Sequence, residues 1–221
     1  MSPMFHLVDK SGAGEWAIPL QILLWMTLLV LLPAAIVSIT PFLRLLVVFH
    51  FLRQALGTQT TPSNQVLIGL SLFLTVVLMQ PTGDTIYQQS IAPLERGEIG
   101  QKEALERAAG PLKRFLGKYV REKDVALFVE ISRSPRPRNV SELDLKVLIP
   151  AYILSELKIG FQIGAVLFLP FLIIDLLVAS ITLSLGMLQL PPVMISAPFK
   201  VLLFVLVDGW NLVVGSLVRS F

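Results

Sequence analysis

The sequence contains no cysteine and only two histidines, His6 and His50. Without cysteine the chain can form neither a disulfide framework nor a thiolate metal site. Neither histidine lies at a metal-ligand spacing from other ligands, so we expect no metal and no cofactor. Charged residues make up 15% of the chain, and a net charge of +3 is too small for a nucleic-acid-binding surface. We therefore expect no nucleic-acid partner.

Motifs for catalysis are also missing. No serine lies in a nucleophile-elbow pattern, and there is no glycine-rich phosphate loop. Asp175 and Asp208 could suggest an intramembrane aspartyl protease, but neither lies in the Gly-x-Gly-Asp context that such a protease needs. The sequence predicts that the protein is not an enzyme.

Hydrophobic residues are abundant, at 54% of the chain, and the mean hydropathy is +0.75. This composition is too apolar for an ordinary soluble domain and indicates a membrane-associated protein with several apolar segments. The run from Trp16 to Ile39 is long enough to cross a bilayer core of about 30 Å. A cleaved signal peptide is the alternative, but this run exceeds a signal-peptide core, no A-x-A-like site follows it, and Glu15 precedes it.

Composition divides the chain into four parts. They are a polar N-terminal extension (1–15), N-terminal apolar helices (16–82), a polar and mainly helical insert (83–142), and C-terminal apolar helical hairpins (143–221). Proline and glycine interrupt every apolar block, so we expect broken helices that pack against protein more than against lipid. Within the insert, residues 99–127 predict a helix with a break near Gly110 and Pro111. No segment alternates like a strand, which predicts an all-α fold.

Charged residues inside the apolar blocks are few and balanced: Arg44, Glu156, Lys158, Asp175, Lys200 and Asp208. Three of each sign favour buried ion pairs between segments or subunits; a proton or substrate path is the alternative. Two positions separate Glu156 from Lys158, so the two point to opposite sides of a helix and cannot neutralise each other. Each needs a partner from another segment or chain, and we expect those partners in neighbouring subunits. Gly160 and Gly164 share the face of Glu156 and offer a surface for close approach.

A second distinctive segment connects two long apolar runs and consists of Gly186, Met187, Leu188, Gln189, Leu190, Pro191 and Pro192. A glycine and two prolines prevent it from being helical throughout, and the thioether of Met187 can repack easily. A simple hairpin turn is one interpretation. If several copies met around an axis, the same loop would form a deformable constriction.

The sequence from Pro150 to Gly164, PAYILSELKIGFQIG, resembles a signature of the FliP family, the flagellar biosynthetic proteins of the type III export gate. Further similar segments are residues 41–44, 56–65, 168–175 and 198–210. The resemblance covers nearly the whole chain after residue 17, and it rests on several long, ordered motifs.

The resemblance implies a non-enzymatic, pore-forming subunit without cofactors. It implies that five copies assemble with FliQ and FliR into a helically arranged core in the bacterial inner membrane, at the flagellar basal body, raised toward the periplasm and in contact with membrane lipid. Unfolded flagellar proteins would pass through this core with FlhB and FlhA as neighbours.

The resemblance also assigns roles to individual residues. It places Glu156 and Asp175 at acidic positions, and Lys200 and Arg121 at basic positions, in the helices that pack between subunits. It makes residues 186–192 the methionine loop that closes the pore. Many relatives have three consecutive methionines there, whereas this chain has Met187, Leu188 and Gln189, so an amide would face the lumen.

Two other functions share these sequence features. An equivalent subunit of a virulence type III secretion injectisome would carry the same motifs, and residues 207–210 favour the flagellar branch. An unrelated multi-spanning transporter or channel would share the composition, but it would leave the polar insert as a loop where an export-gate subunit packs it as helices.

Overall fold

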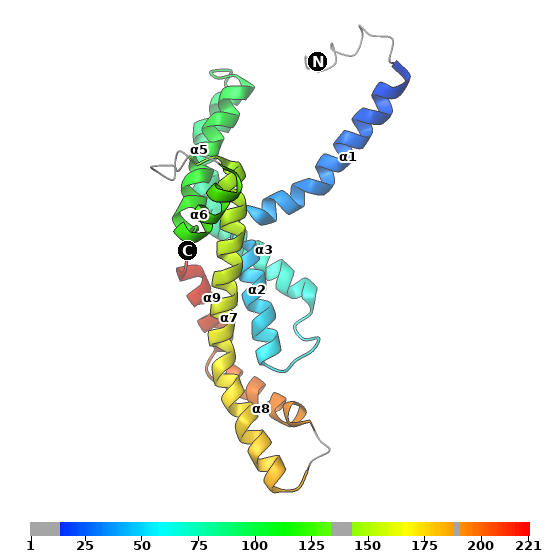
Figure 1. The fold of residues 1–221 in the computed structure, drawn as a ribbon, viewed down its shortest axis with the longest axis vertical. Coiled ribbons are helices and arrows are strands. Elements are labelled where there is room, and N and C mark those ends of the chain that lie inside the picture. Colours follow the sequence, from blue (N-terminus) through cyan, green and yellow to red (C-terminus); the bar gives the residue numbers. More distant parts are fainter. Residues whose placement is uncertain (1–13, 134–142, 188–190) are drawn as a thin grey trace. The chain divides into compact units, whose positions relative to one another are not determined.

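A computed structural model describes residues 14–133, 143–187 and 191–221 of the chain. These residues form helices joined by turns and contain no strand, so the predicted all-α fold is confirmed (Figure 1). The chain divides into two compact units, residues 1–38 and residues 39–221. The first unit holds helix α1 (Gly14–Ser38), whose segment Gln21–Ser38 is long and apolar enough to cross a membrane.

The second unit is built on one long helix, α7. Its elements are α2 (Phe42–Ala55), α3 (Asn64–Ile86), the π-helical turn η2 (Tyr87–Ile91), α4 (Ala92–Glu95), α5 (Gln101–Tyr119), α6 (Glu122–Ile131), α7 (Leu145–Ser184), α8 (Pro192–Leu206) and α9 (Gly209–Arg219). With 40 residues, α7 is about 60 Å long at 1.5 Å per residue. It packs against α2, α5, α6 and α8, and Figure 1 shows α2 running beside it.

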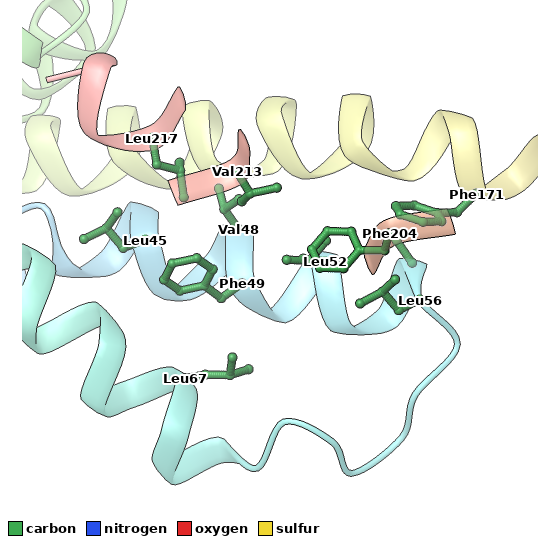
Figure 2. Packing of buried hydrophobic residues seen from close by; sticks show 11 residues of the cluster. Leu45, Val48, Phe49, Leu52, Leu56, Leu67, Phe171, Phe204, Val213 and Leu217 are labelled. Atoms are coloured by element: carbon green, nitrogen blue, oxygen red, sulfur yellow. The ribbon is translucent and has the colours of Figure 1, made fainter. Parts of the chain in front are cut away.

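The hydrophobic core of the second unit surrounds α2. One face of this helix repeats apolar side chains at intervals of three and four, and Leu45, Val48, Phe49 and Leu52 are fully buried there. Figure 2 shows the residues that cover this face, namely Leu67 of α3, Phe171 of α7, Phe204 of α8, and Val213 and Leu217 of α9. A helix of only 14 residues therefore holds four others together.

The polar insert forms a second cluster with the first part of α7. Leu116 of α5 and Val129 of α6 are buried against Val147, Leu148 and Tyr152 of α7. The insert is thus packed as helices against α7 rather than left as a loop.

One prediction for the insert is wrong. Helix α5 continues through Gly110 and Pro111, and the break comes at Val120 and Arg121, where the backbone is extended. A proline inside a helix removes one backbone hydrogen bond. Pro111 is buried, so its packing compensates for that loss.

Within the described segments, three helices are long and apolar enough to cross a membrane. They are α1, the continuous helix Asn64–Glu95, and α7, and a fourth candidate is the pair α8 and α9 if its two helices, bent by 66°, form one span. The chain is therefore a membrane-associated helical protein that contains a broken apolar segment, as the prolines and glycines of the sequence predict.

Candidate functional site

The site begins where two glycines of α7 pack against α2. A Cβ atom placed on Gly164 would lie 2.5 Å from Cγ of Phe51, and one placed on Gly160 would lie 3.1 Å from a methyl carbon of Val47. Only glycine fits at such a distance without displacing its neighbour. The structure therefore contains the predicted face of close approach on α7, and α2 of the same chain packs against it.

The same face of α7 carries Glu156, which binds Arg44 of α2. Nε of Arg44 donates to Oε2 of Glu156 at 2.8 Å, and Nη2 donates to Oε1 at 2.5 Å. The side chains are only 2% and 0% exposed. A bidentate, fully buried pair of this kind satisfies both charges within one chain. Glu156 thus has its partner in another segment, and the expectation of a partner in a neighbouring subunit is corrected.

The other side of the Arg44 guanidinium reaches the end of α9. Nη1 of Arg44 donates to the hydroxyl of Ser220 at 3.1 Å and to its carbonyl oxygen at 3.3 Å. The guanidinium also lies 3.8 Å from the centre of the Phe221 ring, a favourable cation–π geometry. Arg44 therefore connects α2, α7 and the residues after α9.

A second ion pair lies further along α7. Nζ of Lys200 on α8 donates to Oδ2 of Asp175 at 2.7 Å and to the carbonyl oxygen of Ala55 at 3.0 Å. The hydroxyl of Ser196 donates to the other carboxylate oxygen at 2.5 Å. Lys200 is buried, so its charge depends on these two oxygens. This pair fixes α8 to α7 and to the end of α2.

Arg121 belongs to a third polar contact, which holds the insert on α7. The main-chain N–H of Arg121 donates to Oγ of Ser155 at 3.0 Å, and that hydroxyl donates to Oδ2 of Asp124 at 2.6 Å. The Arg121 guanidinium is 3.9 Å from the same carboxylate. The resemblance had pointed to Arg121, whereas Ser155 and Asp124 were not predicted.

Replacing Ser155 with alanine is expected to lower the free energy of unfolding by about 1 to 2 kcal/mol, because the Arg121 N–H and the Asp124 carboxylate lose a buried partner. Ser180 lies on the same helix, is exposed, and bonds only to the carbonyl oxygen of Leu176. Thermal unfolding of the purified protein should show a lower Tm for Ser155→Ala and no change for Ser180→Ala. Equal effects of the two substitutions would contradict a docking role for Ser155.

The two remaining predicted charges have no ionic partner in the described part of the chain. Lys158 is exposed on α7. Asp208 lies between α8 and α9 with φ of +51°, and its carboxylate accepts one hydrogen bond, from Nδ2 of Asn211 at 3.1 Å. The structure therefore joins four of the six predicted charges in two pairs and leaves one of each sign.

The predicted pore loop is described only at its ends. Gly186 lies two residues after the end of α7 with φ of +75°, a left-handed conformation that favours glycine, and Met187 follows it with 40% of its surface exposed. Pro191 and Pro192 begin α8. Leu188, Gln189 and Leu190 lie outside the described residues, as does most of the predicted N-terminal extension 1–15.

His50 has the surroundings of a packed residue. Its Nδ1 lies 3.1 Å from Nη2 of Arg53, and because an arginine can only donate, the ring is a neutral acceptor there. Burial, and then the charge of Arg53, lower the pKa of His50 below its ordinary value. Within the described ranges there is no group of three or more histidine, aspartate or glutamate side chains that could hold a metal ion.

The fold and its paired charges define a class: all-helical, membrane-associated proteins whose helices close around buried ion pairs. The model of the FliP family matches residues 25–217 of this chain. The chain belongs to the FliP family.

Relatives of similar length support that assignment. The flagellar biosynthetic protein FliP of Bacillus subtilis is 44% identical over 221 residues, which cover all of both chains. FliP of Caulobacter vibrioides is 49% identical over 211 residues, 96% of this chain and 79% of the relative. FliP of Pectobacterium carotovorum is 46% identical over 211 residues, 96% of this chain and 82% of the relative.

Proposed function

We propose that this chain is a pore-forming structural subunit of the flagellar type III protein export gate, which passes unfolded flagellar proteins across the inner membrane. The observation that carries the proposal is membership of the FliP family along almost the whole chain, with relatives that are named flagellar biosynthetic proteins. The contacts agree with a structural role, because Arg44, Glu156, Asp175 and Lys200 are engaged in ion pairs rather than left free for proton transfer. We propose no enzymatic activity.

The proposed partners follow from the same family. Five copies of the chain would assemble with FliQ and FliR, beside FlhB and FlhA, at the flagellar basal body, with the core raised toward the periplasm. The exposure of α7 supports assembly: only 11% of the residues in an 18-residue apolar stretch of this helix are buried within the chain. So large an apolar surface needs further protein or lipid to cover it.

A virulence injectisome would use an equivalent subunit in the same way. The relatives' names favour the flagellar apparatus. Deleting the gene in its own bacterium tests this choice: we expect loss of swimming and of flagellar protein in the medium, with both restored by a plasmid copy. Normal filaments in the deletion strain would contradict the proposal.

The loop at residues 186–192 is proposed to close the pore. Replacing Met187 and Gln189 together with alanine should increase the leak of ions through the closed complex, because two side chains that fill the constriction are shortened. Potassium efflux from proteoliposomes measures this leak. Met194→Ala is the control, since Met194 is a 75% exposed methionine of α8 beyond the loop. An unchanged leak in the double variant would exclude the gasket role.

A further inference from the structure

Of the six charges predicted inside the apolar blocks, two are left over once the pairs within the chain are formed. Arg44 is neutralised by Glu156, and Lys200 by Asp175. Lys158 and Asp208 have opposite signs, and neither has an ionic partner among the described residues. The two charges are complementary. If each lies on an exposed apolar surface, the surface with the lysine in one copy can bind the surface with the aspartate in another.

Lys158 points away from the core of its own chain. It is two positions from both Glu156 and Gly160, which face α2, so it lies on the far side of α7. Leu169 and Leu172 follow on the same side of this helix and are 58% and 45% exposed. A lysine on such an apolar face needs a carboxylate nearby, because an unpaired charge costs about 2.5 to 3.5 kcal/mol in a membrane-spanning helix.

Asp208 is held in place on a second apolar surface. A Cβ on Gly209 would lie 2.2 Å from the Phe204 ring, so the backbone at the bend between α8 and α9 is tightly packed. The flanking Leu206 and Val207 are 73% and 49% exposed. The carboxylate of Asp208 accepts one described hydrogen bond, from the side-chain amide of Asn211, and this neutral donor does not neutralise its charge.

Lys158 and Asp208 cannot meet within one chain. The Phe204 ring, which packs beside Gly209, lies with its centre 6.4 Å from that of Phe171 on α7. Phe171 follows Lys158 by thirteen positions, which is about 20 Å along a helix. A lysine side chain does not reach that far, so a pair requires a second copy that is shifted along the axis of α7.

We propose that Lys158 of one copy binds Asp208 of a second copy in a staggered contact between their exposed apolar helix faces. Different surfaces meet in this contact, so it is heterologous and can repeat from copy to copy around an axis. The proposal rests on the proposed function, which requires several copies of the chain, and it names the residues that join them.

Asp84 is the competing carboxylate and fits less well. Both Asp84 and Asp208 are exposed, but Asp84 lies on α3 beside polar neighbours such as Gln80, Thr82 and Thr85. Water can solvate a carboxylate in those surroundings, so Asp84 does not need a lysine from another copy.

Disulfide trapping tests the contact directly, because the natural chain has no cysteine. In native membranes treated with an oxidant, Lys158→Cys combined with Asp208→Cys is expected to give linked dimers and higher species on non-reducing gels. Each single variant, and Lys158→Cys combined with Asp84→Cys, should give none. Equal trapping with Asp84→Cys, or no trapping of the 158 and 208 pair, would overturn the proposal.

A charge exchange provides the second test. Lys158→Asp places two carboxylates at every contact and should abolish the multi-copy species seen by native mass spectrometry, and Asp208→Lys should do the same. The double variant Lys158→Asp with Asp208→Lys should restore them. The pair would be contradicted if the multi-copy species persisted in both single variants. It would also be contradicted if the Asp208→Lys variant kept these species and lost them only when anionic lipid was removed.

The two tests also separate this contact from the proposed function. A chain that still assembles and exports flagellar protein with Lys158→Asp contradicts the contact but leaves the proposed function standing. A natural chain that shows no multi-copy species contradicts both the contact and the proposed assembly of five copies.

Discussion

Replacing Glu156 with alanine is expected to lower the free energy of unfolding by about 3 to 5 kcal/mol, the usual cost of removing one member of a buried ion pair. The reason is the charge that remains: Arg44 is 2% exposed and would keep only Ser220 and an aromatic ring as partners. For a chain of this size the loss corresponds to a fall in Tm of roughly 6 to 20 °C. Circular dichroism of the purified protein in detergent measures it.

A matched control lies two positions away. Lys158→Ala also removes one charge from α7, but at an exposed position, so it should change the free energy of unfolding of the single chain by no more than about 0.5 kcal/mol. The double variant Arg44→Met with Glu156→Leu should recover most of the stability, since an apolar pair of similar volume leaves no buried charge. A fall in Tm that is the same for Glu156→Ala and Lys158→Ala would contradict the importance of the pair.

Replacing Gly164 with valine is expected to cost about 3 kcal/mol, the upper end of the usual range for overpacking. The new Cβ would lie 2.5 Å from Cγ and 2.8 Å from Cβ of Phe51, so the near end of that side chain, not its flexible tip, must move. The Phe51 ring also packs edge-on against Phe161, with ring centres 5.2 Å apart. Helices α2 and α7 would separate, which should also weaken the ion pair beside them.

The control for Gly164 is Gly69 of α3. A Cβ placed on Gly69 meets no atom within 4 Å, so Gly69→Val should change stability by less than about 0.5 kcal/mol. Adding Phe51→Ala to Gly164→Val should recover part of the lost stability by making room. If Gly164→Val and Gly69→Val have the same Tm, the close packing of α2 on α7 does not contribute to stability as expected.

Local features of the sequence predicted the helices and one face of α7. Glu156, Gly160 and Gly164 recur every four residues, and this spacing alone places them on one side of a helix. The residue that binds Glu156 was not predictable from local spacing. Arg44 is 112 positions from Glu156 along the chain, and nothing in the local sequence fixes how α2 packs on α7.

The polar contact of the insert was missed for a different reason. Ser155 follows Leu154 and precedes Glu156 in an apolar helix, where a small residue indicates only a packed surface. Its hydrogen bonds depend on a break in the insert at Arg121, and the sequence placed that break ten residues earlier, at Pro111. Because the end of α5 was misplaced, the contact between the insert and Ser155 of α7 could not be predicted.

The reach of Arg44 has a consequence for how the chain is made. Its partners Glu156 and Ser220 come 112 and 176 positions later in the sequence. While the ribosome is still producing α3 to α6, Glu156 has not been made, so the guanidinium lacks its native carboxylate and must remain in water or among lipid headgroups. Helix α2 can settle into its final surroundings only after α7 has been synthesised, and its last contacts form only after α9.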